Sequence, residues 1–149
     1  MLRAIGVSNF YPDRLVDLCR FVEVKPAVNQ VETHVFQQQK KAREYMDKYE
    51  VQHESWGPFA EGRRDFFTNP VLVEIGRKYN KSAAQIALRF LIQSNVVVIP
   101  KSTHKDRMEQ NFDFVNITLH NFLKKNEFFG SPPKFTKRSG VNFGGDPVA

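Results

Sequence analysis

The sequence predicts an α/β fold in which parallel strands alternate with helices. Segments with strand-like and helix-like apolar spacing follow one another along most of the chain, and this order is typical of parallel sheets with helical crossovers. The run VVVIP at 96–100 is continuously apolar, as in a strand that is covered on both faces. Polar residues follow the ends of the expected strands, where ligands gather in such folds.

The first part of the chain predicts three strands and two helices. The strands are expected at 3–8, 27–32 and 51–56, although polar residues interrupt the third. The first helix is expected to begin at Pro12, because the fixed φ of proline suits the first helical turn. A second, polar-rich helix is expected over 37–49, with its apolar residues on one side.

Capping residues mark the helices of the next region. Asn69 can cap a helix whose first residue is Pro70. The spacing of Ser82 and Gln85 matches a capping box and opens the apolar helix SAAQIALRFLIQ. Thr103 and Asp106, after the strand at 96–100, have the same spacing, and a short helix is expected to start there. The tail 121–149 is rich in Gly, Pro and Lys without a sustained period, and we expect it to be irregular and compatible with disorder.

Composition narrows the class of protein. The chain has 149 residues, 41% hydrophobic and 26% charged, as expected of one globular domain or part of one. No apolar stretch is long enough to span a bilayer, and no signal peptide is recognised. The single cysteine, Cys19, lies on an apolar helical stripe, which favours a packing role and a cytoplasmic location.

A serine and two cations follow the strand expected at 96–100. A strand end followed by a helix N-terminus presents amide donors and a positive dipole, which favour phosphate. Lys101 would add a charge, Ser102 a hydroxyl donor, and Arg107 a fork for two phosphate oxygens. A capped helix with solvated cations is the commoner outcome of this pattern, so the spacing leaves both interpretations open.

Amide and indole side chains lie at the other expected strand ends. Asn29 and Gln30 carry donors and acceptors, as recognition of a carboxamide requires, but they can equally tie down neighbouring backbone. Trp56 can lay its ring against a flat ligand or be buried in the core. Their joint placement at one end of the sheet favours a ligand site.

The sequence resembles the aldo-keto reductases over residues 3 to about 114. The matching segments, in the order of the family, are IGVSNF (5–10), PAVNQVETH (26–34), WGPFAEG (56–62), KSAAQIALRFLIQ (81–93) and VIPKSTHKDRMEQN (98–111). The combination of SNF, NQVE and IPKS with the following arginine and asparagine is highly specific. The form WGPFAEG looks closest to microbial members that reduce small aldehydes and ketones.

The resemblance implies a fold and a cofactor. The fold would be the C-terminal half, about four β/α units, of a (β/α)8 TIM barrel over residues 1–120, the NADP-binding half, followed by the irregular tail 121–149. The cofactor would be NADP(H), bound across the carboxyl-end rim, and no metal is expected. The partners would be NADPH and a small carbonyl substrate, with neither a nucleic acid nor a membrane.

The resemblance also assigns binding residues, part by part along the cofactor. The nicotinamide carboxamide would be held by Ser8, Asn9 and Gln30, and the nicotinamide ring would stack on Trp56. The loop along the pyrophosphate would contain Gly57, Pro58, Phe59 and Gly62. The 2′-phosphate would bind Lys101, Ser102 and Arg107, which implies a preference for NADPH over NADH. Adenine would contact Gln110 and Asn111, where Gln110 replaces a frequent glutamate.

The catalytic aspartate, tyrosine, lysine and histidine of the family are matched by no motif here, so no catalytic residue is assigned. In the family, the tyrosine is the general acid for the carbonyl oxygen. The tyrosines of this chain fall in helix-like contexts, and His34 is expected to be structural. An eight-stranded barrel needs about 250 residues, so we expect the second half of a reductase, from a truncated product or an incomplete gene model. Its strand edges and apolar inner face would then be open.

Three functions are therefore compared. The first is a polypeptide of the aldo-keto reductase family, an NADP(H)-dependent oxidoreductase that reduces aldehydes and ketones by hydride transfer, inactive as an isolated chain. The second is a non-catalytic half-barrel that binds NADP(H) or pairs with itself or another half-barrel. The third, a nucleic-acid binder, is suggested by the net charge of +6. It is disfavoured because such proteins more often concentrate cations and aromatics on one surface.

Overall fold

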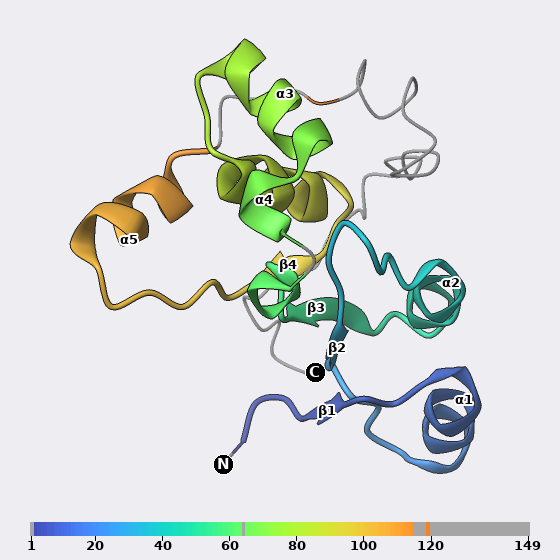
Figure 1. The fold of residues 1–149 in the computed structure, drawn as a ribbon. Helices are drawn as coiled ribbons and strands as arrows, with labels where there is room; N and C mark the ends of the chain where they lie inside the picture. Colours follow the sequence, from blue (N-terminus) through green and yellow to red (C-terminus); the bar gives the residue numbers. More distant parts are fainter. Residues whose placement is uncertain (1, 64, 115–118, 120–149) are drawn as a thin grey trace.

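The structure is a computed structural model that describes residues 2–63, 65–114 and 119 (Figure 1). The strands are β1 (Gly6–Ser8), β2 (Val28–Glu32), β3 (Gln52–Trp56) and β4 (Val97–Val98). The helices are α1 (Pro12–Phe21), α2 (Lys40–Lys48), α3 (Pro70–Tyr79), α4 (Ala83–Gln93) and α5 (Lys105–Phe112), with short 3-10 helices η1 (Ala60–Gly62) and η2 (Phe66–Thr68). The tail expected over 121–149, and the domain boundary before it, lie outside the described residues.

The four strands form one parallel sheet in the order β1-β2-β3-β4, as the alternation predicted (Figure 1). Each crossover advances by one strand in the same direction, which is the winding of a barrel wall, whereas a doubly wound sheet reverses its order. In this register Ser8 lies opposite Gln30, and Glu32 lies opposite Trp56. The carboxyl ends of neighbouring strands therefore meet along one edge.

The helices pack against one face of the sheet through two apolar clusters. One cluster joins α1, α2, β2 and the residue before β3, and its members include Leu15, Cys19, Val31, Met46 and Val51. The other joins η2, α3, α4 and the start of β4, and its members include Phe66, Leu72, Ile86, Leu91 and Val96. Figure 1 shows the same grouping, with α1 beside α2 and α3 beside α4. The packing role predicted for Cys19 is confirmed, since its side chain is buried within the first cluster.

Side-chain hydrogen bonds cap the N-termini of α3 and α4. The Asn69 side chain accepts hydrogen bonds from the backbone amides of Val71 and Leu72, as its position before Pro70 predicted. Ser82 and Gln85 form a complete capping box at the start of α4. Gln85 also donates through Nε2 to the carbonyl oxygen of Asp113, at 2.7 Å. This contact ties the end of α5 to the beginning of α4.

Two predicted helix starts are wrong. The helix expected from residue 37 begins at Lys40, because Gln39 has a left-handed backbone and its Nε2 donates to the Glu32 carbonyl at 2.9 Å. The capping box expected from Thr103 is also absent, since α5 begins at Lys105 with His104 as its N-cap. Both errors have one cause: a polar side chain near the helix start, Gln39 or Ser102, bonds to nearby backbone instead of capping the helix as the spacing suggested.

The strand expected to be covered on both faces is short and half open. Only Val97 and Val98 of the apolar run 96–100 pair with β3. Val96 is buried and Val98 packs against the cluster under α4, whereas Val97 and Ile99 point the other way and are 40% and 57% exposed. The apolar residues of this run therefore lie on both faces of the sheet, and within the described residues only the face that carries Val96 and Val98 is covered.

That second face, called the inner face here, is also more polar than expected. Buried and half-buried residues alternate along β2 and β3, and the half-buried positions face away from the helices. They are Val28, Gln30 and Glu32 on β2, and Gln52, Glu54 and Trp56 on β3. The inner face is thus not the apolar surface that the sequence predicted, but a row of amides and carboxylates beside a few apolar side chains.

No helix in the part of the chain that the structure describes is both long and apolar enough to cross a bilayer. Among the same residues, no three His, Cys, Asp or Glu side chains are grouped in a way that could hold a metal ion.

His53 is a buried histidine on the helix side of β3. Its side chain is about 5% exposed, and Nε2 lies 2.7 Å from the Thr33 hydroxyl. That hydroxyl donates to the carbonyl oxygen of Val31, which leaves it to accept from Nε2–H of His53. Burial, with a smaller contribution from the Arg43 charge, lowers the pKa of His53 to about 3. The interior of this domain therefore contains a base that resists protonation.

We expect the free energy of unfolding to decrease as the pH is lowered from about 6.5 towards 3. The pKa of His53 is about 3 in the folded chain and near 6.5 when exposed, so in this range only the unfolded state binds the proton. The slope attributable to His53 should approach about 1.4 kcal/mol per pH unit. Urea denaturation at pH 7.0, 5.5 and 4.5 should show a weaker pH dependence for His53→Leu than for wild type. Equal pH dependence in both proteins would contradict this account.

Candidate functional site

The predicted binding residues fall into two groups along the carboxyl edge of the sheet. The first, called the amide cluster here, consists of Ser8, Asn9, Gln30 and Trp56 at the ends of β1, β2 and β3. The second, called the cationic cleft, includes six predicted residues: Phe59, Lys101, Ser102, Arg107, Gln110 and Asn111. Gly57, Pro58 and Gly62 lie on the loop between the groups and do not line the cleft.

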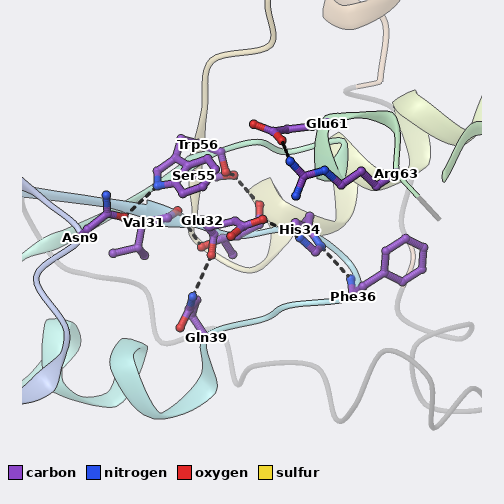
Figure 2. Close-up of polar contacts among 11 residues, drawn as sticks. Asn9, Val31, Glu32, His34, Phe36, Gln39, Ser55, Trp56, Glu61 and Arg63 are labelled. Carbon is purple, nitrogen blue, oxygen red and sulfur yellow. Dashed lines mark hydrogen bonds and ion pairs between the residues drawn. The ribbon is translucent and has the colours of Figure 1, made fainter.

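Hydrogen bonds between neighbouring strands hold the amide cluster together. The Trp56 indole Nε1 donates to Asn9 Oδ1 at 2.9 Å, across the ends of β1 and β3 (Figure 2). The Asn9 backbone amide and the Ser8 hydroxyl both donate to the carbonyl oxygen of Gln30, at 2.9 and 3.0 Å. The backbone of Asn9 is left-handed, with φ of 56°, a conformation that asparagine tolerates better than most residues.

The bonding pattern leaves one donor and one acceptor free in the amide cluster. Because the indole N–H can only donate, Asn9 must present Oδ1 to Trp56, and its Nδ2 has no partner among the described contacts. Gln30 donates through Nε2 to Glu54 Oε1 at 2.6 Å, and its Oε1 likewise has no partner among the described contacts. An unpaired amide N–H2 and an unpaired amide oxygen, on residues at the ends of neighbouring strands, together complement a primary carboxamide.

The sequence left open whether Asn29 and Trp56 face a ligand or are held in the protein interior, and the structure decides between these alternatives. Asn29 is fully buried, and its side chain accepts from the Phe10 amide and donates to the Phe10 carbonyl. Its role is therefore to tie down the backbone after β1. Trp56 is half-buried on the inner face rather than enclosed in the core, so part of its ring is open to a ligand.

His34 has the structural role that the sequence predicted. Its side chain is about 5% exposed, and its Nδ1 accepts from the backbone amide of Phe36 at 3.2 Å (Figure 2). Its Nε2 lies 3.5 Å from Glu32 Oε1. These contacts orient the segment after β2 and leave the imidazole little access to solvent.

The loop after β3 has a strained backbone and an aromatic anchor. Gly57 and Gly62 have positive φ, as glycine permits, but Ala60 and Glu61 also lie in the left-handed region. Glu61 pairs with Arg63 at 2.6 Å near the apex of the loop (Figure 2). Phe59 contacts Phe66 and Phe67 with ring centroids 5.8 Å apart in each pair. These contacts fix the loop where it forms one wall of the cleft.

The cationic cleft has a volume of about 570 Å³ and is open to solvent. Its walls come from the loop after β3, the first turn of α4 and the segment from Lys101 into α5. Besides the six predicted residues, it is lined by Phe67, Ser82, Ala83, Ala84, Thr103 and His104. Lys101 and Arg107 provide two cations, and no carboxylate of the described residues lines the cleft. Such a surface attracts a phosphate group.

Ser102 is already engaged in a local turn. Its Oγ accepts from the backbone amide of His104 at 3.1 Å and donates to the carbonyl oxygen of the same residue at 3.3 Å. The hydroxyl therefore organises the start of α5, and to donate to a phosphate it would have to give up the bond to that carbonyl. The geometry favours Lys101 and Arg107 as the direct ligands for an anion.

Two residues near these groups were missed at the sequence level. His104 lines the cleft beside Lys101 and Arg107, and its place between two assigned residues was the available signal. Glu54 fixes the orientation of the Gln30 amide. The two-residue periodicity of β3 puts Glu54 on the same face as Trp56 and would have indicated it.

Comparison with known proteins gives one consistent family. A family model described as the aldo/keto reductase family matches residues 1–121. The glyoxal reductase of Bacillus subtilis (strain 168) is 43% identical over 118 residues, which cover 79% of this chain and 42% of that protein. The chain spans only 38% to 42% of the length of curated relatives such as this one.

Solved structures agree with this comparison. An aldo-keto reductase named MGS-M4, from a Medee basin deep-sea metagenome library, superposes with a TM-score of 0.81 at 37% identity, over 95% of this chain and 53% of that chain. An aldo-keto reductase crystallised with NADPH superposes with a TM-score of 0.73 at 32% identity, over 78% of this chain and 38% of that chain. The chain therefore belongs to the aldo/keto reductase family, and its four parallel strands form part of that family's (β/α)8 barrel.

Proposed function

We propose that this chain is the NADP(H)-binding half of an NADP(H)-dependent oxidoreductase that reduces aldehydes or ketones to alcohols by hydride transfer. The observation that carries the proposal is the cleft that Lys101 and Arg107 line together, with no carboxylate among its described lining residues, beside the first turns of α4 and α5. This combination of fixed positive charge and helix dipoles suits the 2′-phosphate that distinguishes NADPH from NADH. The NADPH complex of a relative supports the same cofactor.

The two groups of residues suit opposite ends of one cofactor molecule. The free Asn9 Nδ2 and Gln30 Oε1 complement the nicotinamide carboxamide, and the open face of Trp56 can stack on the ring. The loop that starts at Gly57 runs from Trp56 to the cleft, so it can follow the pyrophosphate. Gln110 and Asn111 line the cleft near the start of α4 and can contact adenine. NADPH, when bound, supplies the hydride.

The proton for the carbonyl oxygen has no evident source among the tyrosines of this chain. All four lie on helices or at helix ends: Tyr11 is the N-cap of α1, Tyr45 and Tyr49 lie on or beside α2, and Tyr79 ends α3. None of them lies on a described strand of the sheet, and none matches a catalytic motif of the family. We propose that the general acid belongs to a separate polypeptide segment and that this chain alone binds the cofactor without turning it over.

The charge of the inner face supports a complementing partner rather than self-pairing. Glu32 and Glu54 lie on this face, and none of the four described strands contains a lysine or an arginine. Two copies paired through their inner faces would bring like charges together, which is unfavourable in a closed interior. A half-barrel that presents lysine or arginine inward would neutralise them. A cytoplasmic location, based on the single buried Cys19, stays a prediction.

Arg107→Ala should weaken NADPH binding by about 1.5 to 3 kcal/mol, or roughly 10- to 150-fold in Kd, because a charge-assisted hydrogen bond is lost. NADH has no 2′-phosphate, so its Kd should hardly change. Isothermal titration calorimetry with both cofactors measures the difference. Lys105→Ala is the matched control, since Lys105 carries the same charge on α5 but does not line the cleft. Equal losses for NADPH and NADH would reject the assignment of the 2′-phosphate.

Trp56→Leu should weaken NADPH and NADH equally, because the nicotinamide ring is common to both. The expected loss is about 1 kcal/mol, or roughly fivefold in Kd, the usual contribution of one aromatic stacking contact. Trp56→Phe is the matched control, since it keeps an aromatic ring that can stack, although a smaller one, and removes the indole N–H that donates to Asn9. Calorimetry again gives both values. A loss confined to NADPH would place Trp56 near the wrong end of the cofactor.

The purified chain should shift the fluorescence of NADPH without oxidising it in the presence of methylglyoxal, a small dicarbonyl chosen because the relatives include a glyoxal reductase. The physical reason is that a bound hydride donor needs a positioned acid to complete the reduction. The absorbance of NADPH follows turnover, and the intact Bacillus subtilis glyoxal reductase serves as the positive control. Steady NADPH oxidation by the chain alone would show that it carries its own acid.

A further inference from the structure

We propose that His104 makes the preference of this chain for NADPH over NADH depend on pH, through a positive charge beside the 2′-phosphate that is present in acid and absent in base. The proposal rests on the proposed function, because it requires the 2′-phosphate to bind in the cationic cleft. It concerns a residue to which the sequence motifs assigned no role.

The position of His104 follows from the turn that precedes α5. Ser102 binds both the backbone amide and the backbone carbonyl of His104, which fixes the main chain where α5 begins. The His104 side chain makes no capping hydrogen bond, and it lines the cleft together with Lys101 and Arg107. The imidazole is thus held at the edge of the anion site by its backbone, with both ring nitrogens available to a ligand.

Among the described residues that line the cleft, His104 is the one histidine. Histidine titrates between about pH 5 and 8, while lysine and arginine keep their charge in this range. The lining residues from α4 and from the loop after β3 are Ser82, Ala83, Ala84, Phe59 and Phe67, and none of these titrates. The remaining lining residues, Thr103, Gln110 and Asn111, are likewise uncharged.

Other charged groups near His104, in the part of the chain that the structure describes, come from its own segment and from the start of α4. On its own segment they are Lys101, Lys105, Asp106 and Arg107, and Lys105 pairs with Glu109 at 3.9 Å along the helix. Across the gap to α4, Lys81 is paired with Asp113 at 2.6 Å, outside the cleft. A bound 2′-phosphate brings negative charge into the cleft and favours the protonated form of a neighbouring imidazole, so ligand binding and proton uptake by His104 favour each other.

The experiment compares wild type with His104→Gln and His104→Lys at pH 6.0 and pH 8.5. Glutamine is neutral and lysine is cationic at both values, and the side chain that each replaces makes no capping bond. The ligands are NADP⁺ and NAD⁺, which are stable in mild acid, and calorimetry gives each Kd. Because proteins are compared at the same pH, protonation of the 2′-phosphate itself, near pH 6, cancels from every ratio.

Wild type should resemble His104→Gln at pH 8.5 and His104→Lys at pH 6.0. The expected gain of wild type over His104→Gln for NADP⁺ is about threefold at pH 6.0, as for one exposed ion pair, and close to none at pH 8.5. The Kd for NAD⁺ should be the same in all three proteins at each pH. Circular dichroism checks that the variants are folded.

The possible failures are distinguishable. A ratio of wild type to His104→Gln that is the same at both pH values, while Arg107→Ala still loses NADP⁺ selectively, overturns the role of His104 alone. Equal affinity of wild type for NADP⁺ and NAD⁺, unaffected by Arg107→Ala, overturns the proposed 2′-phosphate site and the role of His104 with it. Failure of both cofactors to bind would likewise overturn the site and the role of His104 together.

Discussion

The parallel register of β1, β2 and β3 is the constraint on which the site depends. It places Gln30 opposite Ser8 and Trp56 opposite Glu32, and so brings the ends of three strands within hydrogen-bond distance of one another. The Trp56 to Asn9 bond spans two of these ends that are 47 residues apart in sequence. A slip of one residue in either pairing would turn Gln30 or Trp56 towards the helices, because side chains alternate between the faces of a sheet. The free amide donor and acceptor would then not exist as a pair.

Charge is distributed unequally over the two ligand-facing surfaces. The cleft between α4 and α5 carries cations and no carboxylate among its described lining residues, while the inner face carries Glu32 and Glu54 with no lysine or arginine in the described strands. An anionic cofactor end therefore has a favourable place to bind in the cleft. The inner face needs a neighbour of opposite charge, because burying two uncompensated carboxylates is costly. The charges of this chain thus favour an anionic ligand in the cleft and a basic partner surface against the inner face.

Much of the fold and of the candidate site was predictable, and the errors have identifiable causes. Asn69 and the Ser82–Gln85 capping box gave correct helix starts because their hydrogen bonds are local. The starts at residue 37 and Thr103 were wrong because Gln39 and Ser102 bond to the backbone of a neighbouring turn, and nothing in the spacing indicates that choice. Asn29 and Gln30 are adjacent and chemically similar, yet one is fully buried against Phe10 and the other keeps a free oxygen. They point to opposite faces of the sheet, and in the part of the chain that the structure describes only the face of Asn29 is covered by helices.

The sequence by itself determined the alternation of strands and helices, the helix caps at Asn69 and Ser82, the core position of Cys19 and the family motifs. These properties depend on neighbours within a few residues, or on the identity of the residues themselves. The tertiary structure decided which amide atoms stay unpaired, that the Ser102 hydroxyl is occupied, that the inner face is acidic, and that His104 stands beside Lys101 and Arg107. Each of these depends on contacts between segments far apart in the chain, or on which way a side chain points once the sheet has formed. The local spacing of residues indicates neither.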